Sequence, residues 1–218
     1  MKIASLLLTT ALTYTGVVSA DTTYYGAHTY EVTITNITPG QTFTPILAVT
    51  HKASFRVFEL GNPASPELAT LAESGDVMPL SDLLDGVPRQ VLDQAAGTGL
   101  LGPGESVILT IRGNRRFNRL SLAAMLIPTN DTFVALDSVP LPKWQDTEYA
   151  LAYDAGSELN DEDCSNIPGP YCGGAALSDE DGEGFVHVSN GIHGGADLDP
   201  TVFDWRNPIA KVSIRRVH

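Results

Sequence analysis

Residues 30–37 read Tyr30-Glu31-Val32-Thr33-Ile34-Thr35-Asn36-Ile37, and apolar and polar side chains alternate along them. This alternation is typical of a half-buried β-strand, because successive side chains of a strand point to opposite faces. Residues 105–112 repeat the pattern, with Val107, Leu109 and Ile111 on one face. Both segments therefore favour strands of a sheet that packs one face on a core.

Six further segments of strand character lie between turns that are rich in Gly, Pro, Asn and Asp. They are residues 43–49, 54–58, 118–127, 132–136, 185–188 and 209–217. Short strands separated by such turns are typical of sandwiches. The sequence predicts an all-β fold, an antiparallel β-sandwich of about eight strands.

One stretch interrupts the strands with helical signals. Ser65 offers an N-cap, and Pro66 stands at the first helical position, where proline is favoured. Leu68 and Leu71 follow at helical spacing. We therefore expect a short helical excursion near residues 65–93, which lies across one end of the sandwich.

The first twenty residues have the three parts of a secretory signal peptide. Lys2 supplies a positive charge, residues 3–18 carry none, and Val18-Ser19-Ala20 offers small residues at a cleavage point. The apolar run is short for a membrane span, which needs ~20 apolar residues. We expect residues 1–20 to be removed. Residues 21–218 then form a single domain that is secreted or otherwise extracytoplasmic, in the medium, the periplasm or at the cell surface.

Acidic residues outnumber basic ones, with 26 Asp and Glu against 13 Lys and Arg and a net charge of −13. This balance argues against nucleic acid and against anionic membrane as partners. Residues 156–184 are rich in Gly, Pro, Asp and Glu and predict a long loop. It holds both cysteines, Cys164 and Cys172, and an even pair this close in an exported chain predicts a disulfide.

Several acidic residues at strand ends and in turns are candidate ligands for calcium. They are Asp131, Asp137, Asp154 and Glu158. Calcium takes six to eight oxygen ligands, largely carboxylates and carbonyls, so carboxylates from separate loops would suffice with carbonyls and water. Residues 178–184, with Asp179 and Asp181, form a second acidic cluster. It lacks the spacing of an EF-hand and is better explained as a solvated loop. Plain solvation could also explain the first group.

Two histidines support a competing hypothesis, an exported hydrolase that uses His187 or His193 with a nearby carboxylate. The chain has no Gly-x-Ser-x-Gly motif, and no third zinc ligand at a defined spacing is evident. The sequence therefore favours a protein that is not an enzyme. A purely structural secreted protein is a third interpretation. Sequons at Asn36 and Asn130 would matter only in a host that glycosylates exported proteins.

An ordered set of motifs resembles the N-terminal domain of the spondin family across nearly the whole exported chain. The motifs are Pro45-Ile-Leu-Ala-Val-Thr-His51, Leu71-Ala-Glu73-Ser-Gly75, Pro128-Thr-Asn-Asp131, Tyr153-Asp154-Ala-Gly-Ser-Glu158 and Asn207-Pro-Ile-Ala-Lys-Val212. The resemblance implies an eight-stranded antiparallel sandwich similar to calcium-dependent membrane-binding domains of the C2 type.

The resemblance also implies one calcium ion in the loops at one end of the sandwich. Carried over by position, its ligands are Asp131, Asp154 and Glu158, with Asp137 as an additional candidate. Glu158 stands where the family prefers Asp, and Thr132 replaces a Trp. The implied function is binding or adhesion at a cell surface or in an extracellular matrix, with a protein or glycan as ligand.

Overall fold

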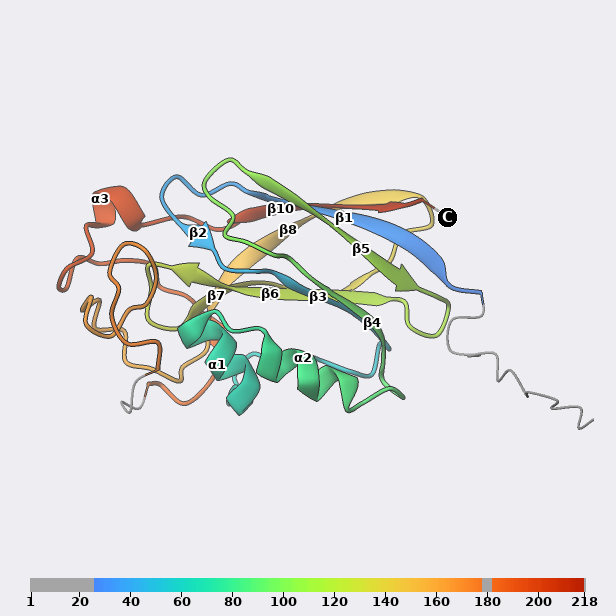
Figure 1. Ribbon diagram of the computed structural model, residues 1–218, viewed down its shortest axis with the longest axis horizontal. Coiled ribbons are helices and arrows are strands. Elements are labelled where there is room, and N and C mark those ends of the chain that lie inside the picture. The colour runs from blue at the N-terminus through green and yellow to red at the C-terminus, as the bar shows by residue number, and fades with distance from the viewer. Residues whose placement is uncertain (1–25, 178–181, 218) are drawn as a thin grey trace, which may run out of the picture.

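The computed structural model describes residues 26–177 and 182–217 (Figure 1). The predicted signal peptide, residues 1–20, and the acidic pair Asp179 and Asp181 lie outside the described residues. Among the described residues, no helix is long and apolar enough to cross a membrane.

Ten strands and three short helices make up the described part of the chain. The strands are β1 (His28–Asn36), β2 (Thr42–Phe43), β3 (Leu47–His51), β4 (Val91–Ala96), β5 (Ser106–Gly113), β6 (Arg119–Ile127), β7 (Thr132–Pro140), β8 (Gln145–Asp154), β9 (His187–Val188) and β10 (Ala210–Arg216). The helices are α1 (Pro66–Ser74), α2 (Met78–Asp85) and α3 (Pro200–Phe203).

Eight of the strands follow one antiparallel path, β4-β3-β6-β7-β8-β10-β1-β5, while β2 pairs with β6 and β9 pairs with β8. The sheet folds over so that β10, β1 and β5 face β6, β3 and β4 (Figure 1). Its two edges approach each other: Asp93 Oδ2 in β4 accepts a hydrogen bond of 2.8 Å from Arg112 N in β5. The sheet is nearly closed, and the prediction of an all-β, sandwich-like fold is confirmed.

Two apolar cores hold the elements together. Between the two layers, the alternation of β1 buries Val32 and Ile34 against residues such as Ile111 and Leu120. The opposite face of β3, β6 and β7 is covered by α1 and α2, and this second core contains Leu68, Leu71 and Phe133. The strands β6 and β7 are therefore buried on both sides, and they carry the turn that begins the candidate site.

The helical excursion begins as the sequence predicts. Ser65 Oγ accepts a hydrogen bond of 3.2 Å from Leu68 N, and Pro66 is the first residue of α1. Gly75 ends the helix with φ of +73°. A Cβ at that position would lie 2.5 Å from Thr44 Cγ2, so both conformation and space require glycine there. The excursion is two helices, and it ends at Val91, where β4 begins. The expectation that it lies across one end of the sandwich is wrong, because the helices pack on a face of β3, β6 and β7.

Several details of the predicted strand pattern are wrong. The predicted strand 43–49 is divided between β2 and β3, and no strand was predicted at β4. Residues 54–58 form no strand, and Phe58 instead packs edge-on against Phe133 at 5.3 Å between ring centroids. The sequence also gave no strand at β8, whose first four residues are polar. Only the second half of β8 alternates between buried and half-buried side chains. Residues 151–154 pair with β7, whereas the first half of β8 pairs with β10.

The long loop after β8 gathers at one end of the sandwich, together with the turn between β6 and β7 and with α3 (Figure 1). The C-terminus lies at the opposite end. Within this loop Cys164 and Cys172 form the predicted disulfide, with 4.7 Å between their Cα atoms. The fold thus collects the acidic loop residues at a single end of the molecule.

Truncation of Phe133 tests the core beneath α1. Phe133 is fully buried and contacts the rings of Phe58 and Tyr153. We expect Phe133→Ala to lower the free energy of unfolding by about 3–5 kcal/mol, because it removes apolar contact and leaves a cavity. Urea unfolding measures the change. The control is Ile108→Ala on β5, which is 61% exposed and should stay within about 0.5 kcal/mol. Equal losses in the two variants would contradict this packing.

Candidate metal centre

Asp131 is the last residue of the turn between β6 and β7, and it is fully buried. Its Oδ2 accepts hydrogen bonds from Ser157 N at 2.8 Å, Glu158 N at 3.1 Å and Ser157 Oγ at 3.2 Å. Its other oxygen, Oδ1, is buried and has no hydrogen-bond donor among the described residues. The loop after β8 thus fixes the carboxylate and leaves one oxygen available to a cation.

Asp154 is the last residue of β8, and it pairs across the ladder with Thr132, the neighbour of Asp131. Its Oδ1 accepts a hydrogen bond of 2.8 Å from Gly156 N, and its Oδ2 accepts one of 2.9 Å from Asn160 Nδ2. The residue is 1% exposed. The ladder between β7 and β8 therefore sets the two aspartates side by side in the interior.

Burial and mutual repulsion disfavour the charged forms of both aspartates. Burial, followed by the negative charge of Asp154, raises the pKa of Asp131 to about 7, although the hydrogen bonds from Ser157 and Glu158 oppose this shift. Burial also raises the pKa of Asp154, against the hydrogen bond from Gly156. Two adjacent carboxyls with raised pKa values are an arrangement that a bound cation would stabilise.

Glu158 is the third predicted ligand, and it is 2% exposed. It follows Ser157 in the same loop, so its backbone N–H and that of Ser157 together hold Asp131. The structure brings all three predicted ligands to the same end of the sandwich. One ligand atom from each does not lie within 4.8 Å of the other two, so a shared cation would require the carboxylates of these described residues to move closer together. Their donors are carboxylate oxygens, which suit a hard cation such as Ca²⁺.

A second loop segment crosses this centre. Gly156 has φ of +64°, and a Cβ there would lie 2.3 Å from Phe185 O. Gly184 N also donates a hydrogen bond of 2.8 Å to Gly156 O. Glycine at position 156 therefore lets residues 182–187 pass directly over the end of β8.

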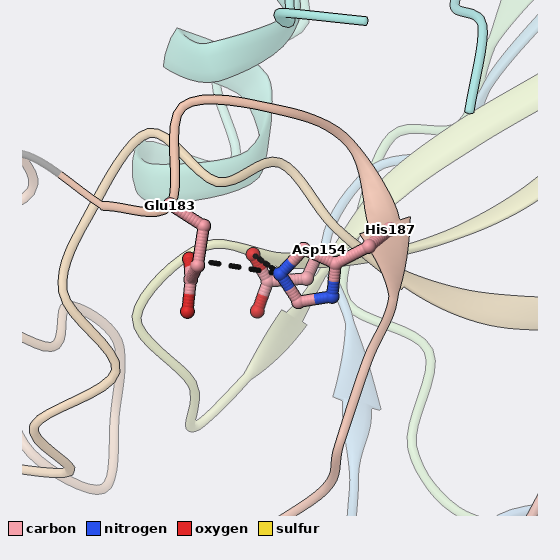
Figure 2. A group of neighbouring side chains, drawn as sticks. All are labelled: Asp154, Glu183 and His187. Carbon is pink, nitrogen blue, oxygen red and sulfur yellow. Dashed lines mark ion pairs between the residues drawn. The ribbon is translucent and has the colours of Figure 1, made fainter. Parts of the chain in front are cut away.

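The crossing segment brings Glu183 and His187 to Asp154 (Figure 2). His187 Nε2 lies 3.4 Å from Asp154 Oδ1 and 3.6 Å from Glu183 Oε2. Asn160 Nδ2 reaches both carboxylates, at 2.9 Å from Asp154 Oδ2 and 3.5 Å from Glu183 Oε1. Glu183 lies in the acidic stretch 178–184, which the sequence favours as a solvated loop, and Asn160 is not among the predicted site residues. The approach of both to Asp154 depends on how two loops cross.

Asp137, the additional candidate ligand, lies away from the centre. It is six residues past Asp131 on β7, and a strand rises about 3.3 Å per residue, so the two residues are about 20 Å apart. Its Oδ2 lies 3.6 Å from Arg56 Nε. Asp137 therefore takes part in an ion pair near the other end of the strand.

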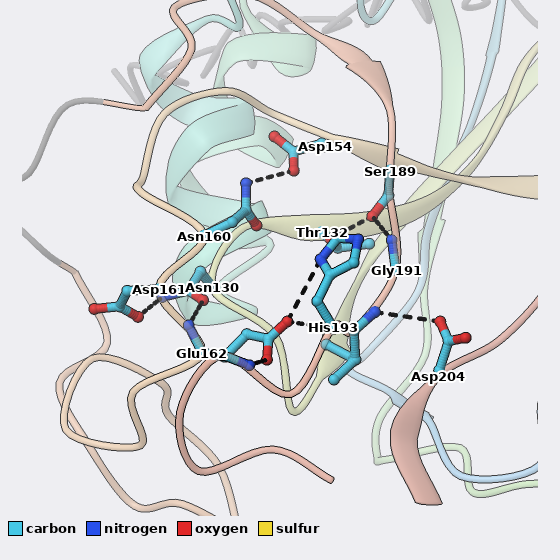
Figure 3. A network of polar contacts seen from close by, with 12 residues as sticks. Asn130, Thr132, Asp154, Asn160, Asp161, Glu162, Ser189, Gly191, His193 and Asp204 are labelled. Atoms are coloured by element: carbon cyan, nitrogen blue, oxygen red, sulfur yellow. Dashed lines mark hydrogen bonds and ion pairs between the residues drawn. The ribbon is translucent and has the colours of Figure 1, made fainter. Parts of the chain in front are cut away.

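His193, the other histidine of the hydrolase hypothesis, belongs to a neighbouring network (Figure 3). Its Nδ1 lies 3.7 Å from Glu162 Oε1, and its side chain is 69% exposed. The carboxylate of Glu162 accepts hydrogen bonds from His193 N at 2.5 Å and Gly195 N at 2.7 Å. Glu162 thus joins the long loop to the segment between β9 and α3.

Both sequon asparagines are buried and use their amide nitrogens. Asn36 Nδ2 donates to Gln41 O at 2.7 Å and to Leu101 O at 3.0 Å. Asn130 Nδ2 donates to Asp161 Oδ1 at 2.9 Å (Figure 3). A glycan on either nitrogen would replace these contacts, so both residues serve the folded structure.

The raised pKa of Asp131 makes stability depend on pH. Between its ordinary pKa of 3.8 and the folded value of about 7, the folded chain holds a proton that the unfolded chain has released. The unfolding free energy therefore falls as pH rises through this window, by at most about 1.4 kcal/mol per pH unit for one proton. Asp131→Asn keeps an acceptor oxygen but cannot titrate, so we expect it to lose this pH-dependent part of the unfolding free energy. Urea unfolding of chelator-treated protein measures it, and equal pH slopes in the two proteins would contradict the assignment.

Comparison of the sequence with known proteins identifies the family of this chain. A search of curated proteins found no match. The family model described as Spondin_N matches residues 23–160, which is more than half of the chain. The match spans all three predicted calcium ligands and ends before Glu183 and His187. The chain belongs to the spondin N-terminal domain family.

Proposed function

We propose that the chain is a secreted calcium-binding module that acts by binding or adhesion at a cell surface or in an extracellular matrix. The family is one of secreted, extracellular-matrix-type modules. The disulfide between Cys164 and Cys172 is compatible with an extracellular location, because such bonds persist in oxidising compartments. Release of residues 1–20 as a signal peptide belongs to the same proposal.

The observation that carries the calcium proposal is the buried Oδ1 of Asp131, which has no hydrogen-bond donor among the described residues. Its partner oxygen is held by two backbone N–H groups, so the carboxylate cannot turn without breaking them. Asp154 and Glu158 would supply further oxygens to the same cation. Carbonyl oxygens or waters would complete the six to eight ligands that calcium takes.

A calcium ion held in this way would connect the turn before β7 with the loop after β8. It would also offset the repulsion between Asp131 and Asp154, whose pKa values are raised. Because the ion binds the folded chain, it stabilises the fold by mass action, by about 2.7 kcal/mol at a hundred times its dissociation constant. The loops so ordered would form the surface that a protein or glycan ligand contacts.

The proposal assigns binding to this centre and no catalytic step. A module that binds through loops fixed by a cation depends on the cation for the shape of those loops. We therefore expect adhesion to a matrix or cell-surface ligand to require calcium and to be lost with chelator.

Thermal unfolding tests the calcium site. We expect millimolar calcium to raise Tm of the chelator-treated protein by about 5–10 °C, which corresponds to about 2–3 kcal/mol for a domain of this size. Magnesium should raise it less, because Mg²⁺ gives up its waters reluctantly and demands octahedral geometry. Asp131→Asn should abolish the calcium response while the metal-free protein stays folded, as judged by circular dichroism.

The matched control is Asp137→Asn, which removes a carboxylate from the same strand about 20 Å away. It should keep the full response to calcium. Lowering the pH below about 7 should weaken calcium binding, because the ion competes with the proton on Asp131. A Tm that is unchanged by calcium, or an equal response in both variants, would overturn the proposal.

A further inference from the structure

We propose a second metal site, one for zinc or a similar borderline divalent ion, formed by Asp154 Oδ1, Glu183 Oε2 and His187 Nε2. It adjoins the proposed calcium site and shares only Asp154 with it. One atom from each of the three residues lies within 4.8 Å of the other two. In Figure 2 the imidazole ring and both carboxylates point toward one another.

The tautomer of His187 supports the assignment. Its Nδ1 lies 3.0 Å from Val188 O, and a carbonyl oxygen only accepts, so Nδ1 carries a proton. Nε2 therefore carries the lone pair when the ring is neutral. This nitrogen is buried, makes no hydrogen bond and faces two carboxylate oxygens. A neutral ring with its lone pair directed at two anions is repulsive unless a proton or a metal cation lies between them.

The distances favour a metal over an ion pair. A charge-assisted hydrogen bond between nitrogen and a carboxylate is about 2.7–2.9 Å long. The observed separations from His187 Nε2 are longer, at 3.4 Å to Asp154 and 3.6 Å to Glu183. A tetrahedral zinc ion about 2.0–2.1 Å from each donor keeps neighbouring donors about 3.3–3.4 Å apart. The separations from His187 Nε2 to the two carboxylate oxygens therefore need to change by only a few tenths of an ångström to suit one ion.

Other hydrogen bonds orient each of the three ligands. Val188 O fixes the histidine ring, and Gly156 N donates to Asp154 Oδ1. Asn160 Nδ2 spans the remaining oxygens of Asp154 and Glu183. Such outer contacts are typical of metal sites, where they set the tautomer and direction of each ligand.

The nature of the donors selects the metal. Imidazole nitrogen suits Zn²⁺, Ni²⁺, Cu²⁺ and Co²⁺, whereas Ca²⁺ and Mg²⁺ take oxygen. The side chains of Glu183 and His187 are 39% and 19% exposed, so a fourth ligand can come from solvent. The two proposed sites thus differ in chemistry although they are neighbours, and each can fail without the other.

Zinc titration of the chelator-treated protein tests the proposal by calorimetry and by Tm. We expect saturable binding of one ion, and cobalt should give the visible absorption of a four-coordinate site with a nitrogen ligand. His187→Gln and Glu183→Gln should each weaken zinc binding by more than about 100-fold, since loss of an outer contact alone costs 10–100-fold. Both variants should keep the calcium response of the unmodified protein.

The matched control is His193→Gln. His193 also lies beside a carboxylate, Glu162, but within the described residues it belongs to no three-ligand group. This variant should bind zinc as the unmodified protein does, and so should Asp131→Asn, which removes only a calcium ligand. No saturable zinc binding, or binding that survives His187→Gln unchanged, would overturn the site. Loss of zinc binding in His193→Gln would mean that the ion binds at His193, and it would also overturn the proposed site.

Discussion

Two backbone N–H groups donate hydrogen bonds to the carboxylate of Asp131, and the structure of this end of the molecule depends on these contacts. Ser157 N and Glu158 N hold Oδ2, so the loop after β8 follows the turn before β7. Asp154 is placed next to this pair by the ladder between the two strands. Two buried carboxyls therefore sit together because backbone geometry requires it, and their charges must be balanced by a proton or a cation.

The choice between proton and cation connects stability with function. Without metal, burial raises the pKa of Asp131 to about 7, so a proton can neutralise the site near neutral pH. With metal, the same carboxylate becomes a ligand and the proton leaves. His187 also affects the charge balance of the site, because its Nε2 lies 3.4 Å from Asp154 Oδ1. Burial lowers its pKa, but the Val188 carbonyl and the charges of Asp154 and Glu183 outweigh that effect and raise it.

The sequence predicted much of the frame and part of the site. Alternation in residues 30–37 and the caps at Ser65 and Gly75 are local signals, and they led to β1 and α1. β8 was missed because its first four residues are polar and show no alternation. Asp131, Asp154 and Glu158 came from family resemblance, and the structure places them at one end of the sandwich. Glu183 stands in an acidic stretch that the sequence favours as a solvated loop, whereas its approach to Asp154 depends on the crossing at Gly156.

A crystal structure of the protein grown with calcium tests most directly whether Asp131 Oδ1 binds a calcium ion. We expect one calcium ion at about 2.3–2.6 Å from Asp131 Oδ1, with an oxygen of Asp154 also in contact. Ser157 N and Glu158 N should still hold Asp131 Oδ2. A calcium-saturated crystal in which Asp131 Oδ1 contacts only water or protein, with the ion elsewhere or absent, would contradict it.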